Sequence, residues 1–328
     1  MKRIIFDKRW EGGHGIGRFS SEISKRIDFK NVIKIRIKPV SPFDIFITPW
    51  YLIFNDFIYF TPGFNAPWFF IKRAIVTIHD LNHIDIKGND SLLKRMYYKF
   101  VLKRACRKSL AIFTVSEFSK NRIVEWSGAD SNKITVVNNG VSSFFKKDGE
   151  AYKPGYDYFF CVSNRKEHKN EFRLIEAYSL LRNREGIKLL FTGEPTKKLM
   201  EYISAKGVEG DVLFSGFLSD EALACYYRGA KALLMPSLYE GFGLPVIEAM
   251  ACGIPTLVSN TTALGEIGKD CSILVDPMSI PDIINGLQRI ISDSDHMKHL
   301  STLGLERAKS YTWDNTSKII TNTLTELL

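Results

Sequence analysis

The chain has 328 residues, of which 45% are hydrophobic and 25% charged, a composition typical of a soluble globular protein with room for two ordinary domains. Its five cysteines are scattered without a C-x-x-C pair or a metal-ligand spacing, which excludes a disulfide framework and a zinc site and predicts buried thiols in a reducing compartment. The formal net charge of +9 is uneven: residues 1–155 carry +13 (27 Lys and Arg against 14 Asp and Glu) and residues 156–328 carry −4 (18 against 22), so the first half is the one expected to meet anions.

The N-terminal stretch predicts a short strand, Arg3 to Asp7, followed by a glycine-rich loop and a helix. Only three apolar residues precede the charge at Asp7, so we expect no signal peptide. The loop, W-E-G-G-H-G-I-G, does not have the spacing G-x-G-x-x-G, and no acidic residue follows among Asn31 to Arg36. Both observations disfavour a dinucleotide site.

An aromatic segment follows, with twelve aromatic residues between Phe43 and Phe70. Residues 44–48 and 57–61 are interpreted as buried parallel strands. Polar residues and a proline interrupt the run, so it does not predict a membrane-spanning helix. For the aromatics near turns, core packing is the first interpretation, and stacking on a sugar or contact with a membrane interface is the alternative; these residues are Trp50, Phe64, Trp68, Phe69 and Phe70.

The rest of the first half alternates between predicted strands and helices. A strand over 74–78 brings His79 and Asp80 to its carboxyl end, where open α/β sheets place their ligands. Residues 91–108 follow the helical period and carry seven Lys or Arg, so this helix either rests on anionic lipid or presents a solvated face. A strand over 110–116, a helix over 117–127 and a strand with a glycine turn over 134–141 complete the first domain.

The second half repeats the pattern after a linker predicted at residues 149–157. Strands predicted at 158–163, 189–193, 212–216, 232–235, 256–259 and 273–275 alternate with helices, which indicates a second parallel sheet. After the first of these strands, Arg165, Lys166 and Lys169 precede a helix that begins near Asn170. Cations beside a helix N-terminus suit a diphosphate.

The most informative stretch is P-S-L-Y-E-G-F-G-L-P-V-I-E-A-M-A-C-G-I-P, residues 236–255. An apolar strand ends at Pro236, and a helix is predicted from Leu244 because Pro245 suits its first turn. The glycines between them allow close approach of the backbone to a ligand, and the free N–H groups of the helix face an anion or hydroxyl. Two carboxylates, Glu240 and Glu248, flank the turn. A lone glutamate there would be a solvated charge, but the pair, the glycines and the prolines together favour a sugar-nucleotide site.

With these residues the chain resembles the family 4 glycosyltransferases of the GT-B fold. The resemblance implies an α/β protein of two doubly wound Rossmann-like domains, residues 1–152 and 153–311, with a helix over about 312–328 packing back on the first. It implies that Glu240 and His79 act near the donor sugar and that Lys169 grips the donor phosphates, with Arg165 either standing in for the usual arginine or leaving Lys169 with less help. It also implies donor contacts from Phe242, Gly243 and Leu244, ribose contacts from Glu248, and a glycine-loop contact at Gly13.

The resemblance implies a retaining hexosyltransferase, with GDP-mannose as the favoured donor and a UDP-sugar or dTDP-rhamnose as the alternative. No D-x-D cluster lies beside the site, so we expect no metal, and no cofactor besides the nucleotide-sugar substrate. The expected acceptor is a saccharide, in particular a lipid-linked one, which an enzyme in the cytoplasm or on the inner face of the membrane would reach. Other readings are a phosphorylase or epimerase of the same fold, or a non-catalytic polyanion-binding protein, although no nucleic-acid-binding motif is found.

Overall fold

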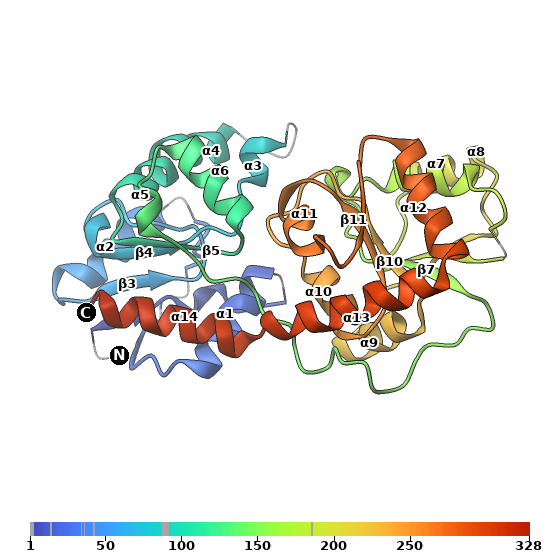
Figure 1. Cartoon of the computed structure of the whole chain (residues 1–328). Helices are drawn as coiled ribbons and strands as arrows, with labels where there is room; N and C mark the ends of the chain where they lie inside the picture. Colours follow the sequence, from blue (N-terminus) through green and yellow to red (C-terminus); the bar gives the residue numbers. More distant parts are fainter. Residues whose placement is uncertain are drawn as a thin grey trace. The chain divides into compact units, whose positions relative to one another are not determined.

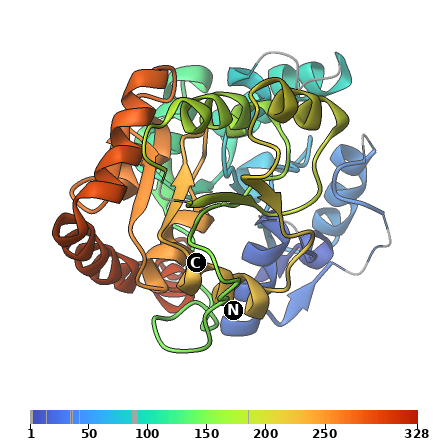
Figure 2. The same cartoon turned by 90° about the vertical axis from the view of Figure 1, so that its right-hand side faces the viewer.

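A computed structural model describes residues 3–13, 15–33, 35, 37–41, 43–86, 92–184 and 186–328. The chain divides into two compact units (Figure 1), and Figure 2 shows the same chain turned by 90°. Unit 1 consists of Met1–Gly140 and Trp313–Leu328, and unit 2 is Val141–Thr312. The division falls after Gly140, whereas the sequence suggested residue 152, and the expected linker, residues 149–157, belongs to unit 2 and contains no helix or strand. Each unit holds a parallel sheet, which confirms the predicted α/β class.

In the described part of unit 1, six parallel strands form a sheet in the order β2-β1-β3-β4-β5-β6. Their side chains alternate between two apolar clusters, because successive residues of a strand point to opposite faces: Ile75 belongs to one cluster and Val76 to the other. The strands are β1 (Ile4–Phe6), β2 (Asn31–Val32), β3 (Ile58–Thr61), β4 (Ala74–Thr77), β5 (Ala111–Thr114) and β6 (Ile134–Val136).

Helices cover both faces of this sheet. The α-helices described in unit 1 are α1 (Gly15–Arg26), α2 (Asp44–Ile53), α3 (Asn82–Asp85), α4 (Leu92–Met96), α5 (Lys103–Lys108), α6 (Glu117–Ser127) and α14 (Trp313–Glu326). A π-helical segment, Tyr97–Leu102, joins α4 to α5, so the predicted basic helix is present from residue 92 to 108, while Ser91 lies outside the described residues. Figure 1 shows α14 beside α1, and Trp313 packs edge to face on Phe19 with ring centroids 6.2 Å apart.

The predicted strand over 44–48 is wrong, because these residues open helix α2. The Thr48 hydroxyl donates to Asp44 Oδ2 at 3.1 Å, a contact one helical turn long. Pro49 lies inside the helix and has no N–H to give to the carbonyl four residues earlier. That carbonyl, on Ile45, instead accepts from Trp68 N–H at 2.9 Å. A tertiary contact thus compensates for the proline and lets the helix run on.

Helix α2 leaves much of the aromatic segment exposed to water. Core packing is wrong for Trp50, Phe69 and Phe70, which are exposed, while Phe64 and Trp68 are partly buried against the core of unit 1. Further large apolar side chains on α2 and the basic helix are also exposed: Phe43, Phe46, Ile53, Phe54, Leu93, Met96 and Phe100. Across the described residues, no helix combines the length and apolar character that a membrane crossing requires.

Unit 2 holds, in its described residues, a second six-stranded parallel sheet in the order β12-β11-β10-β7-β8-β9. The strands are β7 (Tyr158–Cys161), β8 (Lys188–Phe191), β9 (Val212–Phe214), β10 (Ala232–Met235), β11 (Thr256–Ser259) and β12 (Ile273–Val275). The helices are α7 (Glu171–Leu180), α8 (Lys197–Ala205), α9 (Asp220–Gly229), α10 (Leu244–Ala251), α11 (Thr262–Gly268), α12 (Ile280–Ser292) and α13 (Ser294–Ser310). The strands lie where the sequence predicts them, to within two residues.

Candidate active site

The turn between β10 and α10 has the predicted strand, loop and helix form. Helix α10 begins at Leu244 with Pro245 in its first turn. Gly243 precedes it with φ +129°, a conformation that side-chain-bearing residues rarely adopt. A Cβ atom at this position would lie 2.7 Å from Leu264 Cδ2, so space as well as backbone conformation requires glycine. Glycine at this position therefore allows the tight turn from which α10 begins.

Lys169 and Glu240 meet in an ion pair at the carboxyl ends of the strands. Lys169 closes a short 3-10 turn, Glu167–Lys169, after β7, and Glu240 lies in the loop before α10. The Lys169 Nζ and Glu240 Oε1 atoms are 2.7 Å apart, with side-chain exposures of 13% and 14%. The structure thus brings together the predicted phosphate-binding cation and the predicted sugar-side carboxylate.

Two contacts hold the Lys169 segment against the Glu240 loop. The backbone carbonyl of His168 accepts from Leu238 N–H at 2.7 Å. The side-chain amide of Asn170 donates to the carbonyls of Pro236, at 2.9 Å, and Pro277, at 2.7 Å. Asn170 has φ +61°, in the left-handed region that asparagine tolerates better than most residues. The sequence placed Asn170 at the start of the helix but did not reveal this role, because its side chain makes no capping hydrogen bond and instead reaches carbonyls far along the chain.

Glu248, the second carboxylate, is buried on α10 with 3% of its surface exposed. Its Oε2 atom accepts a hydrogen bond from the Tyr227 hydroxyl of α9 at 3.0 Å. A carboxylate accepts several hydrogen bonds at once, so the contact with Tyr227 does not by itself exclude a ribose hydroxyl as another donor. The ribose-binding role of Glu248 stays a prediction.

Arg165 lies in a setting that the sequence did not predict. Its guanidinium donates to Glu171 Oε1, to the carbonyl of Thr192 and, at 3.0 Å, to the carbonyl of Glu194. The rings of Phe191 and Phe214 have their centroids 5.3 and 5.1 Å from its central carbon. The observed contacts tie the loop after β7 to β8 and α7, while a donor-binding role for Arg165 stays a prediction.

His168 is a further residue of the site that sequence reasoning missed. Its side chain is buried, and burial lowers the pKa of His168 because a charged imidazolium loses its hydration. The negative charge of Glu240 opposes this shift, and the positive charges of Lys169 and Lys166 add to it. We therefore expect a neutral imidazole beside the Lys169 and Glu240 pair at neutral pH.

Two buried hydroxyls lie on the loops that neighbour Glu240. The hydroxyls of Ser237 and Thr262 find no hydrogen-bond partner among the residues that the structure describes. Thr262 begins α11 with φ +60°, and the next residue, Ala263, donates its N–H to the Glu240 carbonyl at 3.4 Å. An unpaired buried hydroxyl costs about 1–3 kcal/mol, so these loops suit a polar ligand that supplies the missing partners.

His79 and Gly13, the remaining predicted site residues, belong to unit 1. His79 follows β4, and its Nε2 atom lies 2.9 Å from the carbonyl oxygen of Pro62. Because a carbonyl oxygen can only accept, Nε2 carries the proton in this contact. The ring of His79 also meets Phe19 edge to face, at 5.0 Å between centroids. Gly13 is exposed with open space around its Cα. The donor-site roles of both residues stay predictions.

Models of two protein families match the chain. The family described as "Glycosyl transferases group 1" matches residues 143–307, and the one described as "Glycosyltransferase Family 4" matches residues 42–143. The chain belongs to the group 1 glycosyltransferases of family 4. The predicted resemblance is thereby confirmed, as is the predicted enzyme class, a hexosyl-transferring glycosyltransferase.

Known proteins extend this assignment. The chain is 28% identical to O-antigen chain mannosyltransferase B of Escherichia coli, over 80% of the chain and 72% of that protein. It is 26% identical to the serotype-specific mannosyltransferase WbdA of Escherichia coli, over 81% of the chain but only 34% of that protein. Among solved structures, a sucrose-phosphate synthase from Thermosynechococcus elongatus superposes with a TM-score of 0.79 at 18% identity, covering 100% of the chain and 99% of that structure. These likenesses confirm the GT-B fold.

Proposed function

We propose that this glycosyltransferase moves mannose from GDP-mannose to a growing, lipid-linked surface polysaccharide, with retention of configuration at the transferred sugar. Mannose and the polysaccharide acceptor are supported by the relatives named as O-antigen and serotype-specific mannosyltransferases. Retention is supported by family membership alone, since no side chain of the chain is assigned as a nucleophile.

The ion pair of Lys169 and Glu240 carries the proposal. Breaking a glycosidic bond to a nucleoside diphosphate builds negative charge on the leaving phosphate, and a fixed cation stabilises that charge more in the transition state than in the ground state. Lys169 supplies such a cation, and its contact with Glu240 at 2.7 Å fixes its position. In this scheme the backbone N–H groups at the N-terminus of α10 also stabilise the leaving diphosphate, and no metal is required.

A donor panel tests the activity. The purified chain is incubated with GDP-mannose, UDP-glucose, UDP-galactose and dTDP-rhamnose, with and without a water-soluble mannan fragment as acceptor. We expect nucleoside diphosphate release from GDP-mannose only when the acceptor is present. Release of the nucleoside diphosphate from a UDP-sugar or from dTDP-rhamnose instead would identify that nucleotide-sugar as the donor in place of GDP-mannose. Isomerisation of a nucleotide-sugar without release of nucleoside diphosphate would indicate an epimerase, and formation of a sugar phosphate from the mannan fragment and inorganic phosphate would indicate a phosphorylase. Salt-sensitive polyanion binding without turnover would indicate a non-catalytic protein.

A peripheral position on a membrane is the second part of the proposal. It is supported by the net charge of +13 in residues 1–155 and by exposed apolar side chains beside exposed cations on the basic helix. Cations near a surface of anionic lipid contribute about 1 kcal/mol each, and exposed aromatic rings are typical of membrane interfaces. A lipid-linked acceptor would be reached from such a position.

Vesicle sedimentation tests this attachment. We expect the chain to sediment with anionic but not with neutral vesicles, and to be released by roughly 0.5 M salt, because surface charges are screened over about 8 Å at physiological ionic strength. Replacing Lys94, Arg95, Lys99 and Lys103 by serine should reduce binding. Equal binding to neutral vesicles would assign the attachment to the exposed aromatics, and binding to neither would favour a soluble acceptor.

A further inference from the structure

Unit 1 contains a cavity of about 190 Å³ that the donor site does not use. It lies between the start of α2, the loop that follows β3, and the helix formed by α4 and the π-helical segment. Its lining is mainly apolar and aromatic, and consists of Pro39, Val40, Ser41, Asp44, Ile45, Phe64, Asn65, His83, Leu93, Lys94, Tyr97 and Tyr98. Apolar cavities of about 150 Å³ are large enough to bind benzene, so this one admits a short length of hydrocarbon.

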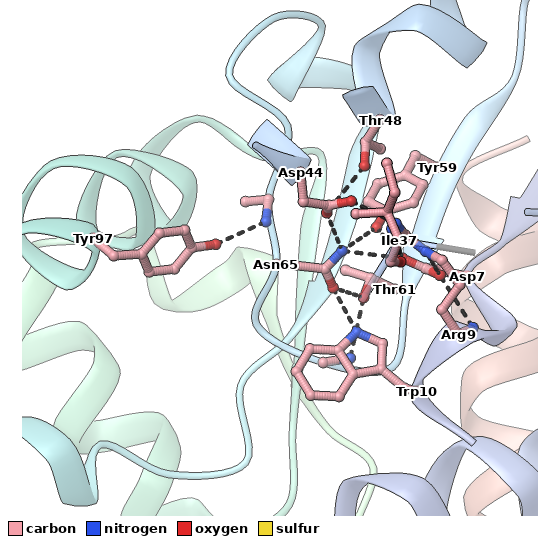
Figure 3. A network of polar contacts seen from close by, with 12 residues as sticks. Asp7, Arg9, Trp10, Ile37, Asp44, Thr48, Tyr59, Thr61, Asn65 and Tyr97 are labelled. Carbon is pink, nitrogen blue, oxygen red and sulfur yellow. Dashed lines mark hydrogen bonds and ion pairs between the residues drawn. The ribbon is translucent and has the colours of Figure 1, made fainter. Parts of the chain in front are cut away.

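Two polar side chains of the cavity wall, Asp44 and Asn65, are engaged in a buried network (Figure 3). Asp44 accepts from Arg9 at 2.5 Å and from the Asn65 amide at 2.8 Å. Asn65 also donates to Asp7 at 3.0 Å and accepts from the Trp10 indole at 2.6 Å. Arg9 also donates to Asp7, and although burial opposes it, the hydrogen bonds from Arg9 to Asp7 and Asp44 raise the pKa of Arg9, so its guanidinium stays charged.

Tyr97 presents its ring rather than its hydroxyl to the cavity. Its hydroxyl donates to the carbonyl of Phe64 at 3.0 Å and accepts from the N–H of Ala66 at 3.1 Å. The polar atoms of Asp44, Asn65 and Tyr97 that face this region therefore have hydrogen-bond partners within the protein. A saccharide placed here would lose hydrogen bonds to water without replacement, at about 1–3 kcal/mol for each buried group, whereas a hydrocarbon would lose none.

Exposed apolar side chains and a positively charged side chain lie together at the opening of the cavity. Val40 and Leu93 line the cavity, yet 59% and 71% of their surfaces are exposed. Lys94 also lines it and is exposed, and Arg95 follows on the same helix. Apolar walls with a cation at the opening complement an amphiphile that has a hydrocarbon chain and a phosphate head.

We propose that this cavity binds the head-proximal hydrocarbon of a prenyl phosphate, the class of lipid carrier that the proposed function requires, with Lys94 facing the phosphate. The proposal rests on the lipid-linked acceptor of the proposed function. In this proposal the protein recognises the lipid part of the acceptor as well as its sugar. The cavity in unit 1 selects the lipid carrier because binding buries the apolar surface of the hydrocarbon.

Binding of isopentenyl, geranyl and farnesyl phosphate to the full chain, measured by calorimetry below their micelle concentrations, tests the proposal. Affinity should rise with chain length, with farnesyl phosphate at least about tenfold tighter than isopentenyl phosphate, a gain that burial of roughly two methylene groups would produce. Inorganic phosphate should bind no better than isopentenyl phosphate. Affinity that is independent of chain length would overturn the proposal.

Substitutions at the cavity are compared with one outside it. Leu93→Asn removes an apolar rim and Ser41→Phe fills the cavity, and each should weaken farnesyl phosphate at least about fivefold. The control is Phe54→Asn directly after α2, a side chain that is 72% exposed and does not line the cavity, and it should not change the affinity for farnesyl phosphate. An equal loss in the control would mean adsorption to the apolar surface, and would overturn the proposal.

The activity proposal can fail separately. Transfer from GDP-mannose to a water-soluble acceptor, found together with chain-length-independent binding, would reject the cavity and leave the proposed function standing. Chain-length-dependent binding that Leu93→Asn abolishes, found without sugar transfer, would support the cavity and reject the proposed transfer.

Discussion

Lys169 and Glu240 lie 71 residues apart in the chain, and their charged atoms are 2.7 Å apart in the fold. Replacing Lys169 by alanine should lower both donor affinity and turnover, because the leaving diphosphate loses a cation as its charge grows. Steady-state kinetics with GDP-mannose measure both effects, and Lys166→Ala, at an exposed neighbouring position, is the control. Normal turnover in Lys169→Ala would remove Lys169 from the leaving-group role.

Glu240→Gln should separate turnover from nucleotide binding. We expect turnover to fall at least about tenfold, which is 1.4 kcal/mol of barrier, with little change in the affinity for GDP. The reason is that Glu240 is assigned to the sugar side of the donor. Calorimetry with GDP is the second measurement, and a loss of GDP affinity with preserved turnover would reverse the roles of the two glutamates.

Glu248→Ala should weaken nucleoside diphosphate binding. Hydrogen bonds from ribose hydroxyls to a charged acceptor contribute about 1.5–3 kcal/mol each. Calorimetry with GDP measures the loss, and thermal unfolding shows whether the variant stays folded. Tyr227→Phe is the matched control, because it removes the hydroxyl that donates to Glu248 at 3.0 Å and leaves the carboxylate in place. Unchanged GDP affinity in Glu248→Ala would exclude ribose contact.

Arg165→Ala should act mainly on stability. Its pair with Glu171 has side-chain exposures of 12% and 6%, and breaking a buried pair by removing one partner costs about 3–5 kcal/mol. Urea unfolding should show a loss of that size in the free energy of unfolding, whereas Lys166→Ala should change it little. A stable Arg165→Ala variant that has lost donor affinity would instead assign Arg165 to the diphosphate.

His168 should make the stability depend on pH. Burial lowers the pKa of His168 in the folded state below its unfolded value of about 6.5, so the unfolded chain takes up the proton first. The contribution is therefore complete above about pH 6.5 and is lost as the pH falls below it. Urea unfolding between pH 7.5 and 5 should show a shallower fall for His168→Gln than for the parent chain. His299→Gln, at an exposed position, is the control, and identical slopes in all three would contradict the prediction.

The turn before α10 was predictable because its signals are local. Pro245 marks the start of the helix and Gly243 permits φ +129°, and both are visible in the sequence without any knowledge of distant contacts. Helix α2 was not predictable in this way. An apolar run with a proline fits a strand as well as a helix. The helix depends on a distant contact, because Trp68 N–H donates to the Ile45 carbonyl, which Pro49 cannot reach with an N–H of its own.

The geometry of the candidate site depends on contacts over long sequence distances. Asn170 holds the Lys169 segment in place by donating to the carbonyls of Pro236 and Pro277, which lie 66 and 107 residues further along the chain. No local sequence pattern predicts partners at such distances. Arg165 shows the opposite difficulty, because a cation before a helix suggests a ligand, whereas packing between Phe191 and Phe214 directs its guanidinium into the protein. Composition and spacing identify which residue types are present, and the fold decides which of them face one another.

Helix α14 affects when the core of unit 1 can be completed during synthesis of the chain. Trp313, Ile320 and Leu324 are buried in the same cluster as Phe19 and Ile23 of α1, so the core of unit 1 includes residues from both sides of unit 2 in the chain. A ribosome delivers α1 long before α14, and the whole of unit 2 emerges between them. Until then α1 can pack on the sheet of unit 1, but the contribution of α14 to this cluster is missing. The core of unit 1 can therefore be completed only after all of unit 2 has been synthesised.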